Sequence, residues 1–194
     1  GTSSVALLTS EVINLSRNIV ITGDAFVHEA CPDGAPDESG QCTIGLHTGA
    51  FGPGSIIRFQ HIRVEKCGQR GILGKYCMHL HLVSSCPECL FQGNAIEYGH
   101  QRGIVIHGTH LATVAMNVLS DVRGAALYIE DGNEMQNVLM HNVAICPWMR
   151  EGPKRGCTIP GTDNIQADSS DNQAGLWSLA ANNHVFGNRF AGSF

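Results

Sequence analysis

The sequence lacks the features of a nucleic-acid-binding or membrane-spanning chain. Its 12 Lys and Arg residues are outnumbered by 17 Asp and Glu residues. The basic residues are scattered, so they form no stripe that would neutralise a phosphate backbone. No apolar run reaches the ~20 residues that a transmembrane helix needs, and no secretory signal opens the sequence. We expect no nucleic-acid partner and no membrane span here, with any signal or anchor outside this chain.

Helical periodicity and compact catalytic motifs are also absent. There is no GxSxG nucleophile elbow, no phosphate-binding glycine loop and no dinucleotide fingerprint after a strand. Short runs of Val, Ile, Leu and Phe recur instead between Gly and Asn, which is the pattern of short β-strands. With 194 residues, 43% of them hydrophobic, the chain is long enough for one domain or for a piece of an elongated one.

The eight cysteines predict disulfides and therefore an oxidising compartment. Many lie in loop-like segments rich in Pro, Gly and Ser, such as residues 31–42 and 146–157. We interpret the CPEC pair as a structural disulfide in preference to a metal or thiol-exchange motif. The sequon at Asn14 agrees with a secreted chain. The candidate disulfide residues are Cys31, Cys42, Cys67, Cys77, Cys86, Cys89, Cys146 and Cys157.

The sequence repeats itself with a period of about 22–25 residues, since residues 102–122 superimpose on 125–145 when a small insertion is allowed. Four asparagines then fall at equivalent places, at offsets of 23, 25 and 46 residues, and we take the last offset as two periods: Asn94, Asn117, Asn142 and Asn188. Such a period predicts a right-handed parallel β-helix, because each coil must stack on the next to bury its apolar face. We expect an internal asparagine ladder at the bends, a single β-helix segment over residues 1–194, and a long loop between coils at 146–172.

Aligning the coils predicts which residues share a face. Two internal stacks are expected, the first from Leu80, Ile106 and Ile129 and the second from Met78, Ile104 and Leu127. Two exposed ladders should lie outside them, the first from His81, His107 and Glu130 and the second from His79, Val105, Tyr128 and Trp177.

The first exposed ladder is the candidate catalytic site. An imidazole beside a carboxylate suits proton transfer near neutral pH, which points to His81, His107 and Glu130. His79, Tyr128 and Trp177 are candidate glycan-binding residues, because aromatic rings stack on sugars. A plain polar ladder without function is the alternative interpretation.

Metal binding is a further hypothesis. The three histidines of these ladders, with Glu130 or Asp131, offer enough nitrogen and oxygen ligands for zinc or iron. The acidic bend at 130–134, which contains Glu130 and Asp131, and the segment 161–171 are candidate calcium sites, or else solvated turns.

Three segments together resemble a known family: YCMHLHL (76–82), the stretch from Arg102 to Ile145, and DNQAGLWSLAANNHVFGNRFAG (171–192). They are similar to the parallel β-helix region shared by fibrocystin, fibrocystin-like proteins, the cell-migration-inducing hyaluronan-binding protein and transmembrane protein 2. The residues that match the family's motif positions are His79, His81, His107, His110, Glu130 and Asp131. The resemblance implies an extracellular or cell-surface glycoprotein. Some members are hyaluronan-degrading enzymes reported to depend on calcium, and others have no assigned reaction.

Two functional hypotheses follow. The first is a structural or adhesive β-helix with a glycan-binding face, whose partners are extracellular glycans or other copies of a surface assembly. The second is a hyaluronidase-like depolymerase in which His81 or His107 and Glu130 act as acid and base. A lyase version needs a charge-neutralising cation, for which Arg102 and Arg123 are the nearest candidates.

Overall fold

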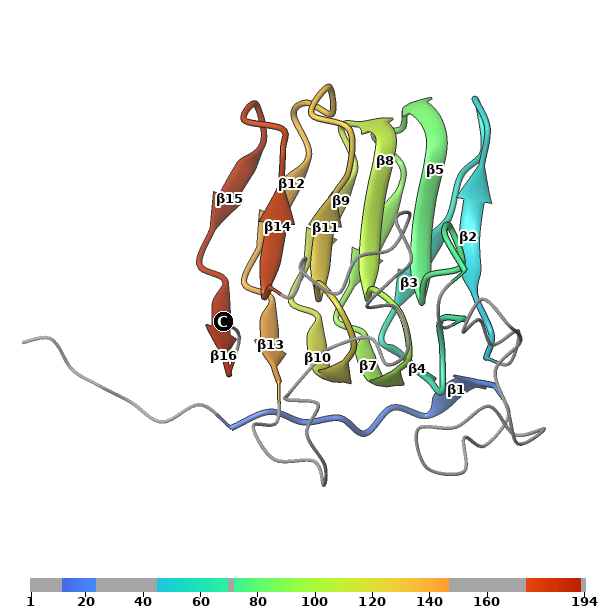
Figure 1. The fold of residues 1–194 in the computed structure, drawn as a ribbon, viewed down its shortest axis with the longest axis vertical. Helices are drawn as coiled ribbons and strands as arrows, with labels where there is room; N and C mark the ends of the chain where they lie inside the picture. Colours follow the sequence, from blue (N-terminus) through green and yellow to red (C-terminus); the bar gives the residue numbers. More distant parts are fainter. Residues whose placement is uncertain (1–11, 24–44, 70–71, 147–173, 193–194) are drawn as a thin grey trace, which may run out of the picture.

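The computed structural model describes residues 12–23, 45–69, 72–146 and 174–192 (Figure 1). Short strands pair in parallel, each with the strand one coil later in the chain, and so build three sheets that run side by side along the molecule. This arrangement confirms the predicted parallel β-helix. No helix long and apolar enough to cross a membrane occurs among the described residues.

Each sheet takes one strand from each coil. Sheet 1 contains, in spatial order, β1 (Ile19–Thr22), β4 (Ile62–Glu65), β7 (Ala95–Gly99), β10 (Val118–Val122), β13 (Val143–Ile145) and β16 (Arg189–Ala191). Sheet 2 contains β2 (Thr48–Phe51), β5 (Met78–Ser85), β8 (Ile104–His110), β11 (Leu127–Ile129) and β14 (Leu176–Ser178). Sheet 3 contains β3 (Arg58–Gln60), β6 (Leu90–Gln92), β9 (Thr113–Ala115), β12 (Val138–Met140) and β15 (His184–Phe186).

The coil length is regular only in the middle of the molecule. Leu127 pairs with Ile104, 23 positions earlier, and Val143 pairs with Val118, 25 positions earlier. The 46-residue offset at the end is a single coil, because β13 pairs directly with β16. Our interpretation of that offset as two periods is therefore wrong. The predicted loop at 146–172 lies, apart from its first residue, outside the described residues.

The inward-facing residues form the stacks that the repeat predicted. Leu80 lies opposite Ile106, and Ile106 lies opposite Ile129. The neighbouring stack of Met78, Ile104 and Leu127 is equally regular, and every member of both stacks is at most 1% exposed. Burying each such side chain contributes roughly 1.5–3 kcal/mol, so these stacks hold the coils in register.

The asparagine ladder is also confirmed. The side-chain oxygen of Asn117 accepts the backbone and side-chain N–H groups of Asn94, both at 3.0 Å, and Asn142 does the same for Asn117 at 3.0 and 2.9 Å. Asn188 continues the ladder. A second ladder, which the repeat did not reveal, joins Asn137 to Asn183 with a 2.9 Å amide contact.

The backbone explains why asparagine recurs at this corner. The residue just before each ladder member has a positive φ: Gly93 (66°), Met116 (55°), His141 (55°) and Gly187 (66°). The left-handed conformation turns the chain sharply, but it costs ~1 kcal/mol or more for each residue other than Gly, Asn or Asp that adopts it. The buried amide bonds that follow offset this cost.

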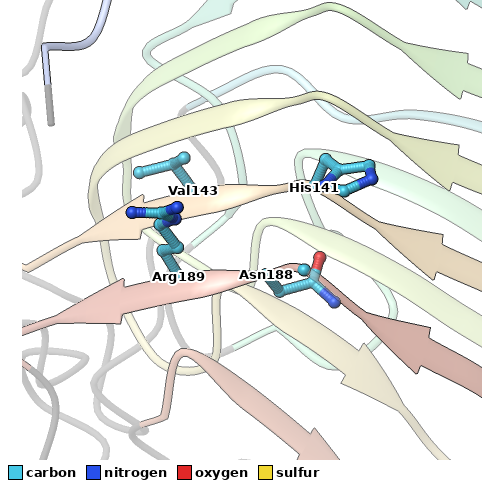
Figure 2. A pocket seen from close by; sticks show the side chains of 5 residues that line it. His141, Val143, Asn188 and Arg189 are labelled. Atoms are coloured by element: carbon cyan, nitrogen blue, oxygen red, sulfur yellow. The ribbon is translucent and has the colours of Figure 1, made fainter. Parts of the chain in front are cut away.

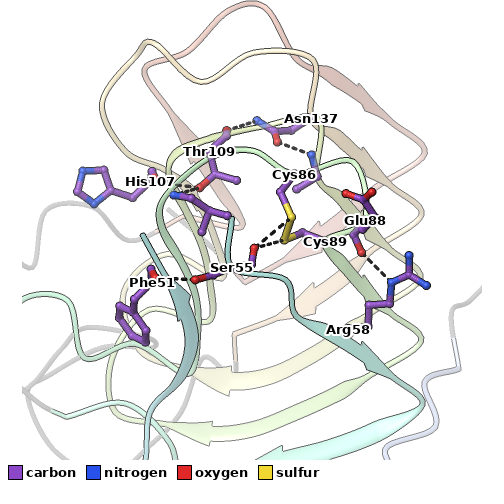
Figure 3. The surroundings of a disulfide bond; sticks show 11 residues. Phe51, Ser55, Arg58, Cys86, Glu88, Cys89, His107, Thr109 and Asn137 are labelled. Carbon is purple, nitrogen blue, oxygen red and sulfur yellow. Dashed lines mark hydrogen bonds between the residues drawn. A yellow bond between two sulfur atoms is a disulfide. The ribbon is translucent and has the colours of Figure 1, made fainter. Parts of the chain in front are cut away.

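Two disulfides join described cysteines. One links Cys67 to Cys77, and the other links Cys86 to Cys89 beside the carbonyl of Ser55 (Figure 3). The second confirms that CPEC is a disulfide. Cys146 is also disulfide-bonded. Three of the predicted disulfide residues lie outside the described residues, namely Cys31, Cys42 and Cys157.

Candidate functional site

Sheet 2 carries the predicted catalytic row on its outer face. His81 on β5 pairs in register with His107 on β8, and their Nδ1 atoms lie 3.0 Å apart. Glu130 follows β11, its N–H donating to the carbonyl of Ile106 at 3.1 Å. Its Oε2 lies 3.7 Å from His107 Nδ1. The stacking of the coils therefore brings together three residues that span 50 positions of the sequence.

This row is only half-exposed. The side chains of His107 and Glu130 are each 19% exposed. Burial raises the pKa of the Glu130 carboxyl, although His107 and Arg102 oppose that shift. Burial, followed by the charge of His107, lowers the pKa of His81. Glu130 thus keeps its proton to a higher pH than an ordinary glutamate, and His81 loses its proton at a lower pH than an ordinary histidine.

His79 points to the same side of β5 as His81 but is buried, at 1% exposure. Its Nδ1 lies 3.1 Å from the carbonyl oxygen of Gly74, and the ring of Tyr76 contacts it at 4.8 Å between centroids. Desolvation is the main reason that its pKa falls to about 3. His79 is therefore neutral at physiological pH, with Nδ1 donating its proton to Gly74.

The second ladder has the predicted register but not the predicted exposure. Tyr128 lies opposite Val105 and Trp177, yet it is 6% exposed. Its ring stacks on Trp177 at 4.4 Å, and the guanidinium of Arg102 lies 4.1 Å from its centroid. The expectation of an exposed ladder is wrong for His79, Val105 and Tyr128, because neighbouring rings and Arg102 cover this strip.

The two arginines considered for a lyase are also buried. Arg102 and Arg123 are each 2% exposed, and Arg102 donates to the hydroxyl of Tyr76 at 2.9 Å. Neither guanidinium reaches the surface that a glycan would contact. The structure therefore contradicts their assignment as charge-neutralising residues.

Phe51 is a residue of the site that the sequence analysis missed. It ends β2 in register with His81, and their rings lie 5.8 Å apart. Its side chain is 48% exposed. Two contacts fix its position, since Gly52 N–H donates to the His81 carbonyl at 2.9 Å and Ser55 Oγ donates to the Phe51 carbonyl at 2.6 Å (Figure 3).

Gly49 makes room for this arrangement. It pairs with His79, and a Cβ at this position would lie 2.6 Å from the His79 carbonyl oxygen and 2.9 Å from the Phe51 ring. We call the four in-register residues of successive coils the outer row: Phe51, His81, His107 and Glu130.

The acidic bend after β11 supports the outer row. Asp131 Oδ2 lies 2.9 Å from His107 Nε2. The buried carboxylate of Glu134 accepts the N–H groups of Gly108, Asp131 and Gly132 at 2.9–3.0 Å. The Glu134 carboxylate thus holds the bend in place through three backbone N–H groups, and calcium binding at this bend stays a prediction. The other predicted calcium segment, 161–171, lies outside the described residues.

The remaining histidines near the site have other contacts. His110 Nδ1 accepts the N–H of Met135 at 3.1 Å, away from the outer row. His47 Nε2 lies 3.1 Å from the amino group of Lys75, and its ring lies 6.1 Å from that of Phe51. No sequence pairing pointed to His47. By contrast, one ring nitrogen from each of His79, His81 and His107 lies within 4.8 Å of the other two.

A hollow of about 380 Å³ lies elsewhere, over β13 and the turn into β16 (Figure 2). His141, Val143 and Arg189 line it, and Asn188 belongs to the internal ladder. The residues that line the hollow include one imidazole and one guanidinium but no carboxylate and no second histidine, so the outer row remains the candidate site.

Asn14 lies on the exposed N-terminal segment, as glycosylation requires, and its side chain accepts the N–H of Ser16 at 2.8 Å. Its glycosylation stays a prediction.

Comparison with known proteins identifies the family. The protein rliB of Dictyostelium discoideum is 30% identical over 190 residues, which cover 95% of this chain and 16% of rliB. Fibrocystin-L of Homo sapiens is 31% identical over 163 residues, which cover 70% of this chain and 4% of Fibrocystin-L. The chain thus spans less than a fifth of either relative. A family model described as CEMIP beta-helix matches residues 43–194, and because this match covers well over half of the sequence, the chain belongs to the CEMIP beta-helix family.

Proposed function

We propose that this chain is an extracellular β-helix segment that binds a glycan along the outer row. The single observation that carries the proposal is the register of the row, in which an exposed phenyl ring and three polar side chains repeat on successive coils. Adjacent coils are about 4.8 Å apart. A rigid row at this spacing suits an elongated ligand, and the disulfides agree with an oxidising compartment.

The chemistry of the row favours neutral sugar groups. Phe51 offers an apolar face for the C–H groups of a pyranose ring, and His81 and Glu130 offer hydrogen-bonding groups beside it. The row contains no Lys or Arg, and the chain carries a net charge of −5. We therefore expect the hydroxyl and acetamido groups of a glycan to contact the row. Among anionic glycans we expect hyaluronan, with one carboxylate per disaccharide, to bind in preference to sulfated glycans, which carry more negative charge.

Calorimetric titration with oligosaccharides of hyaluronan, chondroitin sulfate and heparin tests this proposal. We expect Phe51→Ala to weaken hyaluronan binding by roughly 2–12-fold, since a stacked ring contributes about 0.5–1.5 kcal/mol. Phe186→Ala is the matched control, because Phe186 is 50% exposed and lies on sheet 3. Equal binding by both variants, or binding of heparin alone, contradicts the proposal. Self-association without glycan binding would favour a purely structural or adhesive role.

Glycan cleavage is the second candidate function, and the raised pKa of Glu130 favours it, because a general acid must hold its proton near neutral pH. Incubation of the full-length protein with hyaluronan, followed by measurement of the product chain length, tests this function. Glu130→Gln should abolish chain shortening, while Glu88→Gln, on an exposed loop, should leave it unchanged. Shortening that survives Glu130→Gln excludes this residue as the acid.

A further inference from the structure

We propose that His79, His81, His107 and Glu130 form a binding site for one divalent transition-metal ion of the zinc class. Three ring nitrogens converge within 4.8 Å, and a carboxylate oxygen lies beside them at 3.7 Å from His107 Nδ1. The proposal goes beyond glycan binding and does not depend on it, since its innermost ligand, His79, is buried at 1% exposure and takes no part in glycan contact.

His79 presents a buried lone pair to this space. Because its Nδ1–H donates to the Gly74 carbonyl at 3.1 Å, the proton is absent from Nε2. His79 is only 1% exposed, and its Nε2 is buried without a hydrogen-bond partner. Buried acceptors without a donor are rare in proteins. Histidines that bind metal ions commonly have this arrangement, in which one ring nitrogen donates to a backbone carbonyl and the other binds the ion.

His107 is oriented in the same way, by a carboxylate. Its Nε2–H donates to Asp131 Oδ2 at 2.9 Å, which leaves the lone pair on Nδ1. That Nδ1 faces the Nδ1 of His81 at 3.0 Å. A hydrogen bond at this distance needs a proton on His81 Nδ1, and a metal ion between the two nitrogens replaces that proton.

Glu130 supplies the fourth ligand. Its Oε2 is buried and has no hydrogen-bond partner. Both this oxygen and His79 Nε2 therefore have lone pairs that a metal cation can accept. In a tetrahedral zinc site with bonds of ~2.0–2.1 Å, neighbouring ligand atoms lie about 3.3 Å apart. The observed separations of 3.0 and 3.7 Å lie on either side of this value. The His79 nitrogen lies within 4.8 Å of the nitrogens of the other two histidines, so the half-exposed outer side chains would rotate towards it when the ion binds.

The ligand set selects the kind of ion. Imidazole nitrogens with one carboxylate suit zinc and its neighbours in the first transition series, whereas calcium and magnesium prefer oxygen ligands. Asp131, 45% exposed at its side chain, then acts as a positioning residue that orients His107 and adds negative charge outside the ligand shell.

The test is calorimetric titration of the chelator-stripped chain, with any purification tag removed, using ZnCl₂ and CaCl₂ separately. We expect one Zn²⁺ per chain, no comparable Ca²⁺ binding, and visible absorption bands of tetrahedral Co²⁺ when CoCl₂ is used. Asp131→Asn should weaken Zn²⁺ binding by roughly 10–100-fold, and His81→Gln or His107→Gln by more. His184→Gln, on the exposed strand β15, is the matched control.

Circular dichroism of each variant separates loss of the site from loss of the fold. His81 and His107 are half-exposed, so their glutamine variants should keep the wild-type spectrum, whereas replacement of His79 is less safe. Unchanged Zn²⁺ affinity in the folded His81→Gln/His107→Gln double variant overturns the proposal, as does a wild-type chain that binds no Zn²⁺. Phe51→Ala should bind Zn²⁺ normally whether or not it binds a glycan, so failure of one proposal is distinguishable from failure of the other.

Discussion

The middle of the asparagine ladder provides the sharpest test of how the coils are held together. The Asn117 side chain makes four buried hydrogen bonds. Its oxygen accepts two N–H groups of Asn94 at 3.0 Å, and its amide nitrogen donates to the Asn142 side chain and to the Phe91 carbonyl, both at 2.9 Å. Replacement by alanine removes all four bonds in one step.

The expected cost follows from what remains for each partner. The Asn94 side-chain amide still donates to the Phe59 carbonyl at 2.9 Å, and the Asn142 oxygen still accepts the Asn117 backbone N–H at 3.0 Å. The Asn94 backbone N–H loses its acceptor inside the core. At ~0.5–1 kcal/mol for each of the four lost bonds, with about 1 kcal/mol more for the buried orphan, Asn117→Ala should destabilise the chain by about 3–5 kcal/mol.

The measurement is urea unfolding of the oxidised protein, followed by far-UV circular dichroism. Asn117→Leu keeps the branched shape of the side chain without the hydrogen bonds and should cost as much as alanine. Asn133→Ala, on the exposed bend, should stay within ~0.5 kcal/mol of wild type. In a thermal scan, 3–5 kcal/mol corresponds to a fall in melting temperature of roughly 6–20 °C. If Asn117→Ala costs less than ~1 kcal/mol, the ladder does not stabilise the fold and our account of the corner is wrong.

Three further outcomes follow from the structure. The Cys67→Ala/Cys77→Ala variant should lose about 3 kcal/mol of unfolding free energy in urea, because the disulfide no longer restricts a ten-residue loop of the unfolded chain. Full stability of the reduced wild-type protein would contradict this. Glu134→Ala leaves three backbone N–H groups without an acceptor, so hydrogen exchange at Gly108 should accelerate, while Glu134→Gln should restore much of the protection. In metal-free protein, the free energy of unfolding should fall by up to ~5 kcal/mol as the pH drops from 6.5 toward about 3. The reason is that His79 is protonated in the unfolded chain but stays neutral in the folded one, where its pKa is lowered to about 3. Comparison with His79→Phe isolates this loss, and parallel curves of stability against pH for the two proteins would refute it.

The repeat and its register were predictable because they depend on side chains that recur at fixed spacing. Strand alternation places Leu80 and Ile106 inside, and only a short amide side chain at the corner bonds along the stack. The length of the last coil was not predictable in this way. An offset of 46 residues fits two coils or one coil with an insertion equally well, and only the direct pairing of β13 with β16 distinguishes them.

Phe51 was missed for a related reason. Its coil contains no ladder asparagine, and Thr48 pairs with Met78 across 30 positions, outside the period of the middle coils. Without the period there was no basis for aligning Phe51 with His81. Gly52, directly after Phe51, was the available local signal, and in the structure the chain turns there with a φ of 79°.

The contrast between His79 and His81 shows where alternation stops being informative. Both point out of β5, but His79 is covered by Tyr76 and lies between the small Gly49 and the buried Val105, whereas His81 lies between Phe51 and His107. Alternation determines the face of a side chain, and the neighbouring coils determine whether water reaches it. As a result, one strand supplies both a buried imidazole fixed by a backbone carbonyl and a half-exposed imidazole. In the proposed metal site, His79 is the rigid, buried ligand and the outer side chains adjust to it. The same outer side chains are proposed to contact a glycan, so the metal and the glycan must be tested separately on the same row.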